Sequence, residues 1–259
     1  MPAHDLALLI DAARAAGEIA RRYFEGENKV WDKGRDDPVS EADFAVDTHL
    51  REMLTAARPD YGWLSEETED SPARLEKRRL FVVDPIDGTR AFLAGEATWA
   101  HSIAIVEDGR AVAGAVYLPI KNRLYAARAG DGATLNGAPM RVSAKSRAAH
   151  ARVLITNATL AEKHWPGGVP DVSRHFRPSL AYRLSLVGEG RFDGMLTLRD
   201  SWEWDIAAGA LIAAEAGATV TDRHGAPLRF NNPHPATSGI LAAAPGVHDD
   251  LLRHLAEPA

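Results

Sequence analysis

The sequence predicts a two-part fold, in which an α+β N-terminal half, residues 1–145, packs on an α/β C-terminal half, residues 146–259. Three observations lead to this prediction. Two helical patterns of apolar residues open the chain, a run of strand and hairpin signals follows, and beyond about residue 145 strands alternate with helices. Alternation is typical of α/β units, whereas helices and strands that are segregated along the chain are typical of α+β units.

Two amphipathic helices are expected at the start of the chain. From Asp5 to Phe24, apolar residues recur at three- and four-residue steps, which is the spacing of one buried helix face. A loop from Glu25 to Pro38 should follow, before Ser40 begins a second helix that Pro59 ends. The residues of this second helix that are expected to face inward are Phe44, Leu50 and Leu54.

The rest of the first half is expected to form a largely antiparallel sheet. The apolar run Leu80–Val83 is too short for a helix and suits a buried strand. Strands at Ser102–Val106 and Ala111–Leu118 are joined through Asp108-Gly109, a dipeptide that favours a tight hairpin. A further strand is expected at Arg123–Ala127, so that the two helices would cover one sheet.

In the second half, strand and helix signals alternate, as an α/β unit requires. Its strands are expected at Val153–Thr156, Phe192–Leu198, Ala218–Thr221 and Ile240–Ala243. Its helices are expected at Ser179–Gly188, Ile206–Ala216 and Val247–Leu255.

Composition and charge exclude several classes of protein. Of 259 residues, 46% are hydrophobic and 25% are charged, which is the balance of an ordinary globular chain. No apolar stretch approaches the roughly 18 residues of a membrane helix, and no concentrated basic patch indicates nucleic-acid binding, so neither a membrane nor a nucleic acid is expected as a partner. The absence of cysteine rules out disulfides and thiolate metal sites. The first residues lack a secretory pattern, and we expect a cytoplasmic protein.

The segment Asp84–Thr89, Asp-Pro-Ile-Asp-Gly-Thr, follows the buried strand and carries two aspartates three residues apart. Pro85 stiffens the expected turn, and Gly88 permits backbone geometry or a close approach that a side chain would block. Carboxylates that are held together repel unless a cation neutralises them, and hard oxygen ligands select Mg²⁺, Mn²⁺ or Ca²⁺. The segment therefore indicates a metal site, the alternative being a loop in which Asp84 and Asp87 serve turns and a helix cap.

Two further acidic segments lie apart from this motif in the chain. Glu66 and Glu67 precede the strand, and Asp205 lies in Trp-Glu-Trp-Asp at the start of an alanine-rich helix. Each could be structural, with Glu67 an exposed charge and Asp205 a helix N-terminal residue that favours the macrodipole. Together with Asp84–Thr89, however, they resemble the inositol monophosphatase superfamily of metal-dependent, lithium-sensitive phosphatases.

The resemblance to this superfamily extends over nearly the whole chain, from Asp37–Asp43 to Trp204–Gly209, and rests on the paired patterns D-P-[IL]-D-G-T and W-D-x-A-A-G. It implies a layered αβαβα sandwich with the active site between the two halves. It also implies Mg²⁺ as the cofactor, with two or three ions per site and Mn²⁺ as a substitute, and a small phosphorylated metabolite as the substrate. The implied metal ligands are Glu66, Asp84, the backbone carbonyl of Ile86, Asp87 and Asp205.

The resemblance further implies a proton path and a phosphate site. Thr89, paired with an upstream acid at Asp43, would activate the attacking water, and Glu66 would contribute through a weaker third metal. Asp43 has a structural alternative, because Ser40 and Asp43 also match a variant of the helix capping box. The expected substrate-binding groups are Asp87, the backbone amides of Gly88 and Thr89, and Asp205.

Local features favour one kind of substrate. Inositol monophosphatases usually carry a glutamate seven residues before the Trp-Asp aspartate, where Leu198 stands in this sequence. The adjacent Arg199 could instead bind a second anion of the substrate, the alternative being a solvated surface arginine. Residues 64–67, 71–75, 87–92, 107–110 and 114–119 look more like the 3'(2'),5'-bisphosphate nucleotidase branch of the superfamily.

We therefore expect removal of the 3'-phosphate from adenosine 3',5'-bisphosphate to give AMP. Inositol 1-phosphate and histidinol phosphate are the alternative substrates, and a regulatory protein associated with RNA polymerase is the alternative of another class. Relatives occur both as monomers and as dimers, so a homodimer is also open. The aromatic residues that could stack on a nucleobase, or could instead belong to the core or the rim, are Trp99, Tyr182 and Trp202.

Overall fold

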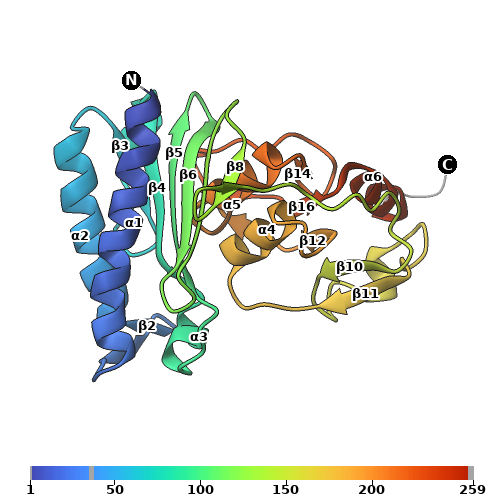
Figure 1. Ribbon diagram of the computed structural model, residues 1–259, viewed down its shortest axis with the longest axis horizontal. Helices are drawn as coiled ribbons and strands as arrows, with labels where there is room; N and C mark the ends of the chain where they lie inside the picture. The colour runs from blue at the N-terminus through green and yellow to red at the C-terminus, as the bar shows by residue number, and fades with distance from the viewer. Residues whose placement is uncertain (1, 35–37, 256–259) are drawn as a thin grey trace.

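The computed structural model describes residues 2–34 and 38–255, so the Asp37 end of the first motif lies outside the described residues. Five layers follow one another across the molecule (Figure 1). They are helices α1 (Pro2–Phe24) and α2 (Glu41–Ala57), a seven-stranded sheet, helices α4 (Leu180–Gly188) and α5 (Glu203–Glu215), a five-stranded sheet, and helix α6 (Pro245–Leu255). This arrangement confirms the predicted αβαβα sandwich.

Helices α1 and α2 lie where the apolar periodicity predicted them. Leu50 and Leu54 are fully buried, as expected, and Pro59 follows the end of α2. Both helices pack on the outer face of the seven-stranded sheet, in one apolar cluster with its strands. The outer helical layer therefore follows directly from the spacing of apolar residues.

The segment between α1 and α2 differs from the prediction. The expected loop contains a short antiparallel hairpin of β1 (Val30–Asp32) and β2 (Pro38–Ser40). The prediction that Phe44 faces inward is wrong, because Phe44 is 42% exposed and its ring lies 5.9 Å from that of Trp31 in β1. Phe44 stands about 100° around the helix from the neighbouring buried Asp43, which places it beside the buried stripe and under the hairpin.

The seven-stranded sheet runs in the order β3-β4-β5-β6-β7-β8-β9, and its neighbours are antiparallel except for the parallel pair β3 and β4. Asp108 and Gly109 both have positive φ in the predicted hairpin turn. The three shortest strands, β3, β8 and β9, were not predicted. The strands are β3 (Gly62–Ser65), β4 (Arg79–Asp87), β5 (Ala100–Glu107), β6 (Arg110–Leu118), β7 (Arg123–Arg128), β8 (Ala133–Leu135) and β9 (Ala138–Pro139).

The five-stranded sheet runs in the order β11-β10-β12-β16-β14. Strand β10 is parallel to β11 and β12, whereas β16 is antiparallel to β12 and β14. A separate pair, β13 (Ser201–Trp202) and β15 (Ala236–Thr237), lies next to the start of α5. The strands of the larger sheet are β10 (Ala151–Leu154), β11 (Val172–His175), β12 (Gly194–Thr197), β14 (Thr219–Thr221) and β16 (Ile240–Ala243).

Helix α5 is the central element of the fold. It is buried on nearly every side after its first turn, because it lies between the two sheets (Figure 1). Small residues permit this packing: a Cβ at Gly209 would lie 2.7 Å from Leu184 Cβ of α4. The helix begins at Glu203, before the expected Ile206, and therefore carries Asp205 in its first turn.

The largest apolar cluster draws residues from both halves of the chain, through α4 and α5. The division near residue 145 stays a prediction. Within residues 2–34 and 38–255, no helix has the length and apolar character needed to span a bilayer.

Candidate active site

Three carboxylates from distant parts of the chain meet between the layers. Glu66 directly follows β3, Asp84 lies in β4, and Asp205 stands in the first turn of α5. One carboxylate oxygen from each lies within 4.8 Å of the other two. The fold therefore brings together three of the four side chains that the resemblance implied as metal ligands.

The motif Asp84–Thr89 has a different backbone from the one expected. Strand β4 continues to Asp87, and its pairing with β5 shifts in register between Asp84 and Asp87. Such irregularities re-aim side chains and are frequent next to active sites. Gly88 then has a φ of +101° at the start of the short helix α3 (Thr89–Leu93), which confirms that this position needs glycine geometry.

Asp84 is the member of the cluster that most requires a cation. It is 1% exposed, and among the described residues its buried Oδ1 has no hydrogen-bond partner. Burial, followed by the negative charges of Glu66, Asp87 and Asp205, raises the pKa of Asp84 well above its ordinary value. An unpaired carboxylate oxygen facing two further carboxylates fits a hard divalent ion such as Mg²⁺.

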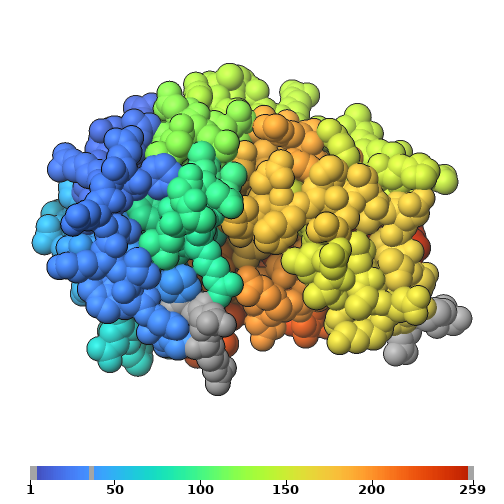
Figure 2. Space-filling model, turned by 90° about the horizontal axis from the view of Figure 1, so that it is seen from below, coloured from blue at the N-terminus to red at the C-terminus, as the bar shows by residue number. Residues whose placement is uncertain are grey.

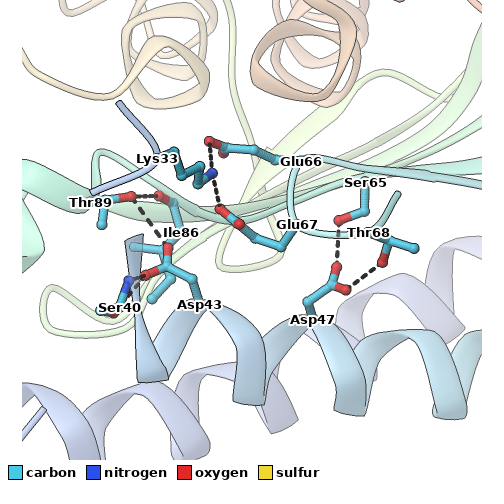
Figure 3. A network of polar contacts seen from close by, with 10 residues as sticks. All are labelled: Lys33, Ser40, Asp43, Asp47, Ser65, Glu66, Glu67, Thr68, Ile86 and Thr89. Atoms are coloured by element: carbon cyan, nitrogen blue, oxygen red, sulfur yellow. Dashed lines mark hydrogen bonds and ion pairs between the residues drawn. The ribbon is translucent and has the colours of Figure 1, made fainter. Parts of the chain in front are cut away.

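Lys33 lies against this cluster, a contact that no sequence pattern indicated (Figure 3). Its Nζ donates to Glu66 Oε1 at 3.1 Å and to Glu67 Oε1 at 2.6 Å. The side chain of Glu67 is only 4% exposed, which contradicts its interpretation as a surface charge. Burial and the charge of Glu66 raise the pKa of Glu67 to about 7, and Lys33 opposes that rise. The ammonium group thus offsets part of the negative charge.

Asp43 makes two sets of contacts at the start of α2 (Figure 3). Its Oδ2 accepts hydrogen bonds from the Ser40 backbone N at 2.8 Å and from Ser40 Oγ at 2.6 Å, so the capping box is confirmed. Its Oδ1 accepts from Thr89 Oγ1 at 3.3 Å, and the same hydroxyl lies 3.1 Å from the Ile86 carbonyl oxygen. Burial raises the pKa of Asp43 to about 6, and the hydrogen bonds from Ser40 oppose this rise. The structural contact and the contact with Thr89 therefore coexist.

Asp87 is held at the N-terminus of α4. Its Oδ2 accepts from Ser179 Oγ and from the Ala181 backbone N, both at 2.6 Å, and its Oδ1 accepts from Leu180 N at 3.2 Å. Burial raises the pKa of Asp87 to about 6, and these hydrogen bonds oppose the rise. Asp87 therefore joins the two halves, and it is not one of the three carboxylates gathered within 4.8 Å.

Two arginines differ in their relation to the site. The predicted Arg199 is exposed in the loop between β12 and β13. Arg183 of α4, which sequence reasoning missed, is only 5% exposed. Burial lowers the pKa of Arg183 to about 10, the charges of Asp87 and Asp205 oppose that change, and Arg199 adds to it. Arg183 therefore lies within electrostatic reach of Asp87 and Asp205, and Arg199 lies within reach of Arg183.

The aromatic residues proposed to stack on a base have different environments. Trp99 and Tyr182 are 1% and 3% exposed, so they belong to the core. Trp202 is 42% exposed and stacks on Trp204, with ring centroids 4.9 Å apart and planes inclined by 10°. Of the three, Trp202 alone is exposed, and its ring also lies 5.1 Å from that of His234.

A separate cleft of about 960 Å³ lies between α3 and the segment that leads into α4. Figure 2 shows this side of the molecule, where the green residues of the first half meet the yellow and orange residues of the second. The charged residues that line the cleft include Arg90, Lys121 and Arg177. None of Glu66, Asp84 and Asp205 lines the cleft. The cleft and the acidic cluster are therefore distinct features.

The raised carboxyl pKa values predict a pH-dependent affinity for Mg²⁺. Of the proposed metal ligands, Asp87 has a pKa that burial raises to about 6, and burial raises the pKa of Asp84 well above its ordinary value. Carboxyl groups must lose their protons before they hold a cation, so the affinity for Mg²⁺ should rise as the pH increases through about 6. Below that pH the affinity should fall by roughly tenfold per pH unit for each ligand that becomes protonated. Isothermal titration between pH 5 and pH 7.5 measures this, and an affinity that stays constant would contradict it.

Five alternating layers with a cluster of hard oxygen ligands between them are the architecture of the layered, metal-dependent phosphatases. The chain belongs to the inositol monophosphatase family, whose sequence profile matches residues 2–258. It is 37% identical to the inositol-1-monophosphatase of Rhizobium meliloti (strain 1021), over 85% of this chain and 86% of that one. It is 32% identical to the histidinol-phosphatase of Chlorobaculum parvum, over the same shares of the two chains.

Among solved structures, the extragenic suppressor protein suhB from Bartonella henselae has a TM-score of 0.82 to this chain at 31% identity, and the match covers 99% of this chain and 100% of that one. Enzymes of the family are phosphatases that use divalent metals, typically Mg²⁺, and act on small phosphorylated substrates. The protein is accordingly a metal-dependent phosphoric monoester hydrolase.

Proposed function

We propose that this phosphatase is a 3'(2'),5'-bisphosphate nucleotidase, which converts adenosine 3',5'-bisphosphate to AMP and phosphate. The observation that supports this choice of substrate is the guanidinium group of Arg183, which lies within electrostatic reach of Asp87, Asp205 and Arg199. Arg199 follows Leu198, which stands where inositol monophosphatases usually carry an acidic side chain. A second anion on the substrate is the natural partner of such a pair.

In this proposal the cations bind in two principal positions. Glu66, Asp84 and the Ile86 carbonyl would hold one ion, Asp84, Asp87 and Asp205 a second, and Glu66 would share a weaker third. Bound Mg²⁺ or Mn²⁺ would neutralise phosphate oxygens, lower the pKa of a water and stabilise the leaving oxygen. Lithium would compete at the second position.

The proton path would run through Thr89. Its hydroxyl has one proton, which can be donated to Asp43 at 3.3 Å, leaving a lone pair to accept a proton from the attacking water. Asp43 is kept in place for this by the two hydrogen bonds from Ser40 on its other oxygen. The backbone amides of Gly88 and Thr89 would contact the reacting phosphate, with Asp87 and Asp205 on the same side.

The guanidinium group of Arg183 is held in place by contacts with the segment before α4. It donates to the backbone carbonyls of Arg177 and Pro178, and its guanidinium carbon lies 4.4 Å from the ring centroid of Phe176. The described residues place no carboxylate in an ion pair with it. A fixed guanidinium loses little conformational entropy when it binds, which favours affinity for a distal phosphate.

Phosphate release from adenosine 3',5'-bisphosphate, inositol 1-phosphate and L-histidinol phosphate, each with Mg²⁺ and with a chelator, tests this function. We expect a preference for the bisphosphonucleotide and no release with the chelator. A preference for inositol 1-phosphate or histidinol phosphate would overturn the choice of substrate. We further propose a cytoplasmic enzyme that acts as a monomer or a homodimer.

The arginines provide a specific prediction. Arg183→Met and Arg199→Met should each lower kcat/KM for the bisphosphonucleotide by roughly 10- to 100-fold, because each removes a charge-assisted hydrogen bond to the second anion. Values for inositol 1-phosphate should change by less than about threefold, since that substrate has one phosphate. Arg174→Met, at an exposed position in β11, serves as the control. Equal losses on both substrates would rule out recognition of a second anion.

A further inference from the structure

A buried polar network connects the two chain segments that carry Glu66 and Asp205. It consists of Arg74 from the short helix η1 (Pro72–Glu76), Glu203 at the start of α5, and the turn formed by residues 231–235 between them. Arg74 is 3% exposed and Glu203 is 0% exposed. Two charged side chains thus lie in the interior, one from each half of the chain, although neither belongs to the acidic cluster.

Arg74 donates hydrogen bonds both to Asp70, in the first half of the chain, and to the turn of residues 231–235. Its Nε and Nη2 donate to the two carboxylate oxygens of Asp70, at 2.6 and 2.9 Å. Its Nη1 donates to Asn231 Oδ1 at 2.7 Å, and its Nη2 also donates to the Asn232 carbonyl at 2.9 Å. The guanidinium therefore attaches the segment after Glu66 to the second half of the chain.

Glu203 holds the same turn from the other side. Its Oε2 accepts from the Asn231 backbone N at 2.7 Å, and its Oε1 accepts from the backbone N and the side-chain Nδ2 of Asn232, at 2.9 and 2.7 Å. Its own backbone N donates to the Pro235 carbonyl at 2.9 Å. Asn231 has a φ of +62°, so the turn is held in a left-handed conformation that these contacts stabilise.

The positions of these residues relate the network to the metal site. Asp70 follows Glu66 by four residues, and Glu203 precedes Asp205 by two, whereas Asp84 lies in β4, the second strand of the seven-stranded sheet. Without cations the carboxylates of Glu66, Asp84 and Asp205 repel one another, and this repulsion favours a larger separation between the end of β3 and the start of α5. A rigid connection between those segments opposes this separation.

We propose that Arg74 and Glu203 are positioning residues that set the separation of Glu66 and Asp205, and thereby the affinity of the enzyme for its divalent ions. Buried ion networks often add little net stability compared with well-packed apolar residues, so a role in geometry is a better reason for their presence than stability alone. Residues that orient metal ligands from behind typically change metal affinity by about 10- to 100-fold when they are replaced. The proposal rests on the metal site given under the proposed function.

The test compares Mn²⁺ binding by the wild-type protein and by Arg74→Met, Arg74→Lys and Glu203→Gln, measured by isothermal titration together with the Tm of the metal-free proteins. Arg79→Met is the control, because Arg79 also pairs with a carboxylate, its Nη2 donating to both oxygens of Glu107 at 3.0 and 2.9 Å, but it lies at the start of β4, away from Asp84. We expect a Kd for Mn²⁺ that rises about 10- to 100-fold in Arg74→Met and Glu203→Gln. Arg74→Lys should recover part of the affinity, kcat at saturating Mg²⁺ should stay within about threefold, and the control should bind Mn²⁺ like the wild type.

A Kd that is unchanged in Arg74→Met and Glu203→Gln, with a Tm lowered as much as in Arg79→Met, would overturn the proposal and leave a purely structural network. If Arg74→Met fails to fold, Asn232→Ala provides the second variant, because it removes the side-chain donor to Glu203, together with a hydrogen bond to the Arg229 carbonyl, and keeps the backbone contacts of the turn. Unchanged Mn²⁺ affinity there would also overturn the proposal. Failure of the wild-type protein to bind Mn²⁺ would instead contradict the proposed metal site, so the two failures are distinguishable.

Discussion

Replacing Asp84 by asparagine is expected to lower kcat/KM by about 10³-fold or more, which corresponds to about 4 kcal/mol of transition-state stabilisation. Asp84 is proposed to contact both principal ions, so its loss weakens the whole site. The metal-free variant should nevertheless be more stable than the metal-free wild type, because a buried carboxylate with an unpaired oxygen is removed. Its Tm should rise by roughly 2–4 °C for each kcal/mol of unfavourable interaction relieved.

Activity assays and thermal melts with and without Mg²⁺ check both parts of this prediction. The wild type should gain stability when Mg²⁺ is added, by mass action, whereas Asp84→Asn should gain little. Asp60→Asn, at an exposed position, is the control and should behave like the wild type. Near-normal turnover of Asp84→Asn at saturating Mg²⁺ would contradict its assignment as a shared metal ligand.

Thr89→Val and Asp43→Asn are each expected to lower kcat by about 10²- to 10⁴-fold with little change in KM, because both remove the path that takes a proton from the attacking water. The hydrogen bond of 3.3 Å from Thr89 Oγ1 to Asp43 Oδ1 is the contact through which the two residues would act together in the proposed proton path. The double variant should therefore be about as slow as the slower single variant, since residues that act together are not additive.

Steady-state kinetics of the four proteins in this cycle measure the coupling. Thr89→Ser keeps the hydroxyl and should retain most activity, which separates proton transfer from loss of volume. Asp43 also caps α2, so the Tm of Asp43→Asn is needed as a check on folding. Additive losses in kcat would show that Asp43 acts only as a cap.

Much of the architecture could be predicted because the spacing of apolar residues within a short segment indicates which of its faces is buried. The helix at Asp5–Phe24 and the hairpin around Asp108-Gly109 depend on neighbours in the sequence, and both are confirmed. Strands β3 and β11, Gly-Trp-Leu-Ser and Val-Ser-Arg-His, were not predicted because they lack a continuous apolar run, whereas the equally short β16 is apolar throughout. Phe44 was misplaced because its apolar character was taken as burial, whereas its ring packs on a hairpin that was itself not predicted.

The residues of the candidate site also fall into two groups, those that a sequence motif indicates and those that no motif indicates. Asp84 and Asp205 lie in dense motifs, and the structure gathers them with Glu66 as the resemblance implied. Lys33 and Arg183 carry no motif, and their importance depends on contacts across long distances in the chain, which a single sequence does not display. The sequence did not predict that Asp87 caps α4. Ser179 is an ordinary N-cap residue, and nothing in the sequence shows that its hydroxyl donates to Asp87.

The most direct test of the metal site is a crystal structure of the enzyme with Mn²⁺, using anomalous scattering to locate the ions. We expect anomalous peaks within about 2.0–2.4 Å of carboxylate oxygens of Asp84, with Glu66 on one ion and Asp205 on another. Lys33 should then no longer contact Glu66 as it does here at 3.1 Å. Anomalous density that avoids Glu66, Asp84 and Asp205 at saturating Mn²⁺ would contradict the central claim.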